Sequence, residues 1–61
     1  MMRSKLDEGN KVKVITSYGA VYEGIVLRLT TYTVILEVKH KRHPIEIEYK
    51  YITDIILEGE A

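Results

Sequence analysis

The sequence contains no cysteine, which excludes disulfide bridges and zinc sites built on thiolates. Glutamine is absent and Asn10 is the only asparagine, whereas Lys, Glu, Ile and Tyr are plentiful, as is typical of thermophile proteins. The 61 residues form one domain, 1–61, and a chain of this size buries only about 60% of its unfolded surface. Because no disulfide can add stability, we expect the chain to self-associate.

Long apolar runs and an excess of one charge are also missing. No run approaches the roughly 20 apolar residues that cross a bilayer, and the segment 1–10 lacks the apolar region of a secretory signal. We therefore expect a soluble, cytoplasmic protein that does not contact membranes. Nine basic and nine acidic side chains give a net charge of zero, which argues against a non-specific coat of nucleic acid. Basic residues outnumber acidic ones up to residue 43, and acidic residues predominate after it. One face of the protein can therefore still carry charge of mainly one sign.

Hydrophobic patterning predicts an all-β fold. Strands are expected at 11–16, 20–29, 32–39, 45–50 and 51–57. The strand 32–39 is nearly continuous in apolar residues, which predicts cover on both faces, whereas 45–50 alternates apolar and charged residues. A hairpin turn is expected at Gly19, and a second one at residues 30–32.

Gly24 lies inside the longest predicted strand, where glycine indicates a bulge or the close approach of another backbone. A strand that bends strongly there allows a very small sheet to curl into a barrel, predicted over 11–57. The segment 1–9 is predicted to be a short helix or a frayed terminus. Ser4 is the candidate N-cap of a helix at 3–8, and Gly9 is its natural end.

The two glycines resemble the first motif of the Sm-like superfamily, which includes the bacterial Hfq proteins. In that family a turn glycine is followed five residues later by a second glycine, as Gly19 is by Gly24. Tyr32 falls where relatives present an aromatic side chain or a histidine to a nucleic-acid base. Thr30 and Val34 replace the family's aspartate and asparagine.

A second resemblance lies near the C-terminus. The segment Tyr49-Lys50-Tyr51-Ile52 is loosely similar to the Tyr-Lys-His signature of Hfq, and the Arg-Gly pair of Sm proteins is missing. The resemblance implies a short N-terminal helix followed by a five-stranded, strongly bent, SH3-like barrel. It also implies a homo-oligomeric ring, a hexamer or heptamer, that binds single-stranded RNA without catalysis and without a cofactor.

Single-stranded RNA is held by aromatic stacking combined with cationic contacts to phosphate. Tyr32 is therefore the best candidate for stacking, and Lys50, between two tyrosines, is the best candidate cation. A compact basic tract before Pro44 predicts secondary phosphate contacts, or else a solvated hairpin tip. The predicted RNA-binding residues are Thr30, Thr31, Tyr32, Lys39, Lys41, Arg42, Tyr49, Lys50 and Tyr51.

Other interpretations remain open. A metal on His40 and His43 has no obvious third ligand. An enzyme would have to use Glu46 and Glu48, two carboxylates that the charged, exposed face of an edge strand explains. The missing family residues and the zero net charge favour a second hypothesis, an interaction or structural oligomer without RNA binding. A monomeric SH3-like module on duplex DNA would need a basic sheet face, which these same acids oppose.

Overall fold

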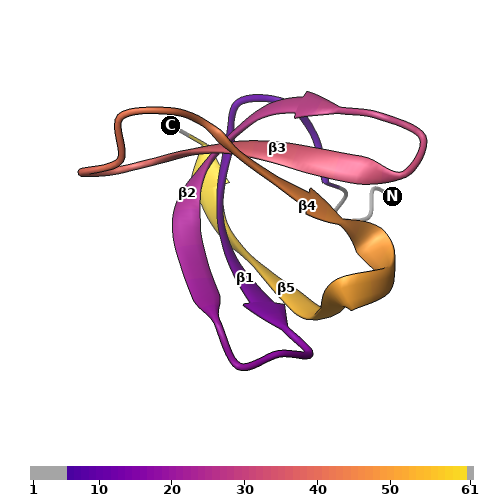
Figure 1. Ribbon diagram of the computed structural model, residues 1–61. Helices are drawn as coiled ribbons and strands as arrows, with labels where there is room; N and C mark the ends of the chain where they lie inside the picture. Colours follow the sequence, from indigo (N-terminus) through magenta and orange to yellow (C-terminus); the bar gives the residue numbers. More distant parts are fainter. Residues whose placement is uncertain (1–5, 61) are drawn as a thin grey trace.

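The computed structural model describes residues 6–60, which form one antiparallel sheet of five strands (Figure 1). The prediction of five strands is thereby confirmed. The strands are β1 (Asn10–Thr16), β2 (Val21–Leu29), β3 (Thr33–Val38), β4 (Ile45–Glu48) and β5 (Ile52–Glu60). Their order in the sheet is β4-β3-β2-β1-β5, so β4 and β5 are the two edges. A single 3-10 turn, η1 (Tyr49–Tyr51), carries the chain from one edge to the other.

Two predicted features of this fold are wrong. The sheet curves strongly but stays open, because its first and last strands in space, β4 and β5, do not pair (Figure 1). Part of the helix predicted at 3–8 lies outside the described residues, and the described part forms a turn instead. In that turn the Asp7 N–H donates to Asn10 Oδ1 at 2.9 Å. So short a segment cannot repay the cost of helix nucleation, and the asparagine offers its backbone another partner.

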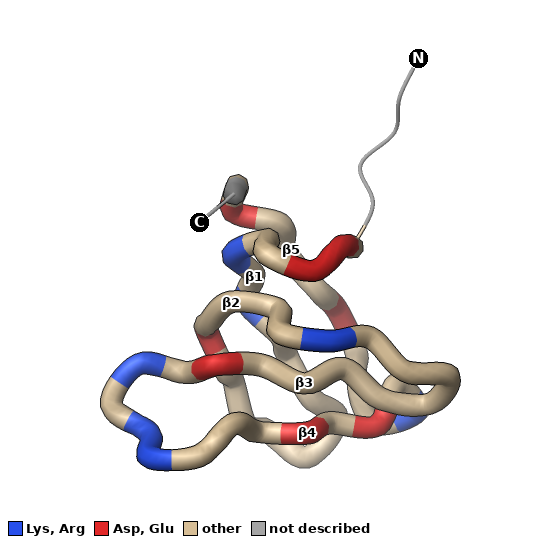
Figure 2. Tube along the Cα trace, turned by 90° about the horizontal axis from the view of Figure 1, so that it is seen from above, with Lys and Arg blue, Asp and Glu red and all other residues tan. Residues whose placement is uncertain are grey.

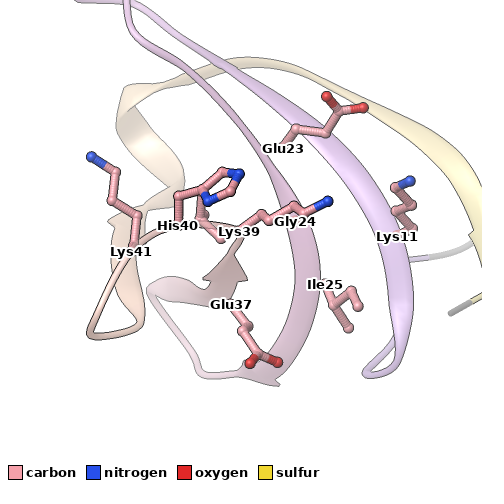
Figure 3. A pocket seen from close by; sticks show the side chains of 9 residues that line it. Lys11, Glu23, Gly24, Ile25, Glu37, Lys39, His40 and Lys41 are labelled. Atoms are coloured by element: carbon pink, nitrogen blue, oxygen red, sulfur yellow. The ribbon is translucent and has the colours of Figure 1, made fainter.

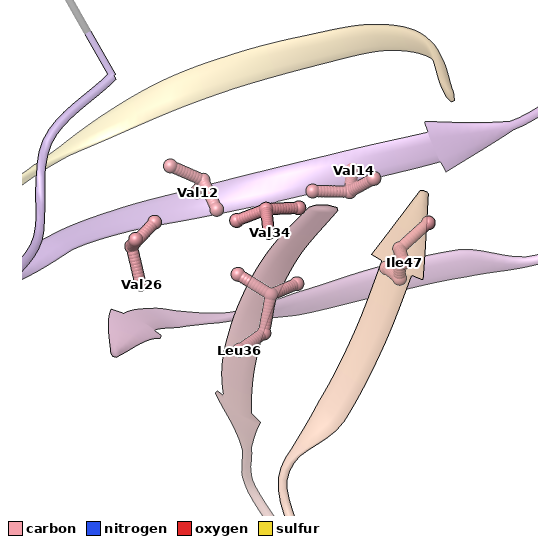
Figure 4. Close-up of a cluster of buried hydrophobic side chains, with 6 residues drawn as sticks. All are labelled: Val12, Val14, Val26, Val34, Leu36 and Ile47. Atoms are coloured by element: carbon pink, nitrogen blue, oxygen red, sulfur yellow. The ribbon is translucent and has the colours of Figure 1, made fainter. Parts of the chain in front are cut away.

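The core lies on the concave side of the sheet and consists of small aliphatic side chains (Figure 4). Alternate positions of each strand point inward, which places valines of β1 next to residues of β3 and β4. Burying each such side chain contributes about 1.5–3 kcal/mol. The six buried hydrophobic residues are Val12, Val14, Val26, Val34, Leu36 and Ile47.

Gly24 brings the backbones of β2 and β3 close together, as the sequence predicts. A Cβ atom at this position would lie only 2.2 Å from the carbonyl oxygen of Glu37. The bulge is elsewhere: the β2–β3 register shifts between Val26 and Arg28, which leaves Leu27 without a partner. Since a bulge increases local bending and twist, β2 curves along its length (Figure 1).

Three strands also differ from the sequence-based predictions, β3 in its burial and β4 and β5 in where they end. The second face of β3 is only partly covered, because Thr33 is buried, Ile35 is half-buried and Glu37 is exposed. β4 ends at Glu48, since the chain leaves the edge there and turns through η1. β5 extends to Glu60, three residues beyond the predicted end. In the described range, no helix has the length and the apolar character needed to cross a membrane.

Candidate functional site

Two of the predicted site segments meet at one end of the sheet. The loop between β2 and β3, residues 30–32, lies beside η1 (Figure 1). The backbone N–H of Tyr49 donates to the carbonyl oxygen of Tyr32 at 2.9 Å. This bond joins segments that are far apart in the sequence, and it fixes the position of Tyr32 relative to Lys50.

Threonines hold the β2–β3 loop in shape. The N–H of Thr33 donates to Thr30 Oγ1 at 3.0 Å, and the N–H of Thr30 donates to the Thr33 carbonyl at 2.9 Å. The hydroxyl of Thr33 in turn donates to Glu46 Oε2 at 2.8 Å. Thr30 is therefore engaged within the loop, while the Tyr32 side chain extends into solvent with 76% of its surface exposed.

Lys50 lies on the same end of the molecule and is free to approach a ligand. Its Nζ atom is 3.6 Å from Glu48 Oε1, and both side chains are mostly exposed. The same Nζ lies 5.2 Å from the centroid of the Tyr51 ring, a cation–π distance. An exposed ion pair contributes about 0–1 kcal/mol, so a phosphate can compete for this lysine.

The tyrosines of η1 have different surroundings. Tyr49 is half-buried and packs against the core, whereas Tyr51 is 43% exposed. Tyr18, for which the sequence pattern indicates only a place in a turn, lies against Tyr51. Their ring centroids are 6.1 Å apart in an edge-to-face arrangement. An aromatic residue in a tight turn is the one sequence signal that could have drawn attention to Tyr18. Tyr18, Tyr32, Lys50 and Tyr51 are carried by η1 and by the two loops whose backbones are hydrogen-bonded to it, and we term these four residues the tyrosine surface.

The predicted basic residues occupy the opposite end of β3. Lys39, Lys41 and Arg42 are exposed in the hairpin between β3 and β4 (Figure 2). His40 adopts φ 72°, which forms the tight turn after β3. Since β3 separates this hairpin from Tyr32, a single chain does not bring the basic tract onto the tyrosine surface.

The basic hairpin borders a groove of about 920 Å³ (Figure 3). Its charged lining is mixed: lysines from β1 and from the hairpin face it together with two glutamates. The charged and imidazole side chains around it are Lys11, Glu23, Glu37, Lys39, His40 and Lys41. Among residues 6–60, no three histidine, aspartate or glutamate side chains gather closely enough to hold a metal ion.

The two carboxylates considered for catalysis each have a partner. Glu46 accepts the hydrogen bond from Thr33, and Glu48 pairs with Lys50. Both therefore contribute to the geometry of the end that carries Tyr32. Comparison of the chain with protein-family models, with curated proteins and with solved structures finds no significant match.

Proposed function

We propose that this chain is the subunit of a Sm-like ring that binds single-stranded RNA and catalyses no reaction. The observation that carries the proposal is the exposed Tyr32 ring, whose backbone carbonyl accepts a hydrogen bond from Tyr49, the residue before Lys50. Unpaired bases stack on aromatic faces regardless of their identity, and a neighbouring cation binds the phosphate. The tyrosine surface offers both kinds of group on η1 and on the two loops that are hydrogen-bonded to it.

The sheet supports the resemblance to Sm-like proteins. Strands β1 to β4 form an antiparallel meander and β5 returns to pair with β1, while β2 contains both a bulge and a glycine that allows a close backbone approach. The second glycine of the motif, Gly19, adopts φ +89°, the left-handed conformation that a turn glycine supplies. Both motif glycines thus have a conformational or steric reason to be glycine.

The open edges support assembly into a ring. β4 and β5 each pair with one neighbouring strand of the sheet. The backbone groups along the other edge of each strand are left for pairing with another chain. In the proposed ring, β4 of one subunit pairs with β5 of the next, a head-to-tail contact that closes by rotation. On β5 the side chains of Ile56 and Leu57 are exposed, and such a contact would cover them. A ring repeats the tyrosine surface several times, so weak single contacts add up to strong binding.

Native mass spectrometry of the full chain, alone and with oligo(U) or oligo(A), tests the ring and its ligand together. We expect a hexamer or heptamer that retains the oligonucleotide. A monomer at micromolar concentration in sedimentation would contradict the ring. A ring that binds neither oligonucleotide would favour the second hypothesis, a structural or protein-interaction oligomer, for which the exposed Ile56 and Leu57 are the supporting observation.

The Glu48→Gln variant is expected to bind RNA about 2- to 5-fold more tightly, because it removes the carboxylate that competes with phosphate for Lys50. The stability should change by less than about 0.5 kcal/mol, since both partners are largely exposed. Fluorescence anisotropy with labelled oligo(U) measures the affinity. The control is Glu58→Gln, which removes the same charge from β5; an equal gain there would indicate a general charge effect.

The basic hairpin makes a separate prediction. If Lys41 and Arg42 each bind a phosphate, their joint replacement by alanine makes the salt dependence weaker. The negative slope of log affinity against log salt should decrease in magnitude by about 0.7 for each phosphate that is no longer neutralised. The decrease should be independent of Tyr32, because β3 separates the two regions. The measurement is an oligo(U) titration at several salt concentrations. An unchanged slope would show that the hairpin is a solvated tip.

A further inference from the structure

The turn η1 is held between two loops, each of which carries an exposed tyrosine. On one side the N–H of Tyr49 donates to the Tyr32 carbonyl at 2.9 Å. On the other side the N–H of Ser17, in the β1–β2 hairpin, donates to the Tyr51 carbonyl at 2.7 Å. Tyr18 is therefore attached to η1 from the side opposite Tyr32, and Lys50 lies on the turn between them.

Tyr18 presents an aromatic ring where a hairpin turn usually carries small or polar residues. Its side chain is 58% exposed, and its ring meets the Tyr51 ring edge to face, with an angle of 69° between the planes. This arrangement is favourable for the two rings and leaves ring surface uncovered. The fold does not need Tyr18 for its core, so the exposed ring is available to a ligand.

The cation next to these rings indicates what kind of ligand fits. Lys50 Nζ lies over the Tyr51 ring, so positive charge and aromatic surface adjoin each other. Partial loss of hydration, followed by the effect of the neighbouring Tyr22 hydroxyl, raises the pKa of Tyr18 above its usual value. The Tyr18 hydroxyl is uncharged at neutral pH with or without this rise, as an ordinary tyrosine is, so it does not repel a phosphate.

We propose that Tyr18 is a second base-stacking residue, and that one RNA strand crosses η1 from Tyr32 to Tyr18 and Tyr51. Lys50 then contacts the phosphate backbone between the two stacked bases. This inference rests on the proposed RNA-binding function and extends it: the ligand is a single strand long enough to reach both flanks of η1, and a lone nucleotide occupies only part of the site. Stacking makes this recognition tolerant of base identity.

The test compares Tyr18→Leu with Tyr18→Phe. Leucine keeps apolar bulk but lacks an aromatic face, whereas phenylalanine keeps the ring, so the pair separates stacking from packing. For binding to oligo(U) and oligo(A) of ten nucleotides, we expect Tyr18→Leu to weaken affinity roughly 5- to 20-fold, since Tyr51 remains. Tyr18→Phe should bind like the wild type. Circular dichroism should show the same fold in all three proteins.

The oligonucleotide length provides a second readout. The loss caused by Tyr18→Leu should disappear with di- or trinucleotides that reach only Tyr32. If the wild type binds RNA and Tyr32→Ala weakens it, but Tyr18→Leu binds ten-nucleotide RNA as the wild type does, the second stacking position is wrong and the proposed function stands. If the wild type binds no RNA at any length, both proposals fail together.

Discussion

Replacing Gly24 with alanine is expected to destabilise the domain by about 3 kcal/mol or more. The added methyl carbon would lie 2.2 Å from the Glu37 carbonyl oxygen and 2.9 Å from the carbonyl carbon. These are backbone atoms of the neighbouring strand, which cannot rotate away as a side chain does. At about 0.05–0.15 kcal/mol per residue, a domain of this size has only a few kcal/mol of stability in total. Urea unfolding followed by circular dichroism should therefore show a greatly lowered midpoint or no folded baseline.

Gly19→Ala is the matched control for this substitution. A Cβ atom at Gly19 would meet no other atom within 4 Å, but its φ of +89° is unfavourable for alanine. The expected cost is about 1–2 kcal/mol, the penalty for a left-handed conformation alone. If the two variants lost equal stability, the close approach of β2 and β3 would not be the reason for glycine at position 24.

Much of this architecture follows from local sequence patterns. Glycine inside a long apolar strand predicts the close approach at Gly24, and the turn residues predict both hairpins. The η1 turn could not be predicted, because Tyr49 continues the apolar–polar alternation of β4 and no glycine or proline interrupts it. Tyr49 packs against the core from a 3-10 turn as it would from a strand, so the pattern is the same for both structures.

Closure of the barrel could not be predicted either, since it depends on whether the two edges meet. Strand patterns define which residues point to the core, but they say little about how far the sheet curls. In this chain β4 is short, and η1 leads directly away from its end. The edges remain apart and exposed, which is the arrangement that a neighbouring subunit would complete.

The site was only partly predictable for a related reason. The resemblance points to Tyr32 and the two flanking tyrosines point to Lys50, and the hydrogen bond between Tyr32 and Tyr49 brings their segments together. The sequence does not indicate a role for Tyr18, because its neighbour Tyr51 is distant in sequence and the contact arises only from the tertiary structure. The basic tract, predicted to make secondary phosphate contacts or to be a solvated hairpin tip, lies at the opposite end of β3 from Tyr32.

The Tyr32→Ala variant is expected to lose roughly 5- to 150-fold in affinity for single-stranded RNA, since stacking of one base contributes about 1–3 kcal/mol. The loss should lie in the upper part of this range in a ring, because each subunit contributes the same tyrosine. Fluorescence anisotropy with oligo(U) and oligo(A) gives the two affinities. Similar losses for both oligonucleotides are expected, because stacking does not depend on base identity.

The fold should tolerate this substitution. The Tyr32 side chain is 76% exposed, and the hydrogen bond with Tyr49 uses the backbone carbonyl, which alanine retains. The unfolding midpoint should therefore stay close to that of the wild type. Tyr32→Phe keeps the aromatic face and should keep the affinity as well, so a loss in both variants would assign the effect to the hydroxyl. A folded Tyr32→Ala protein with wild-type affinity would remove Tyr32 from the RNA site, and with it the observation on which the proposed function depends.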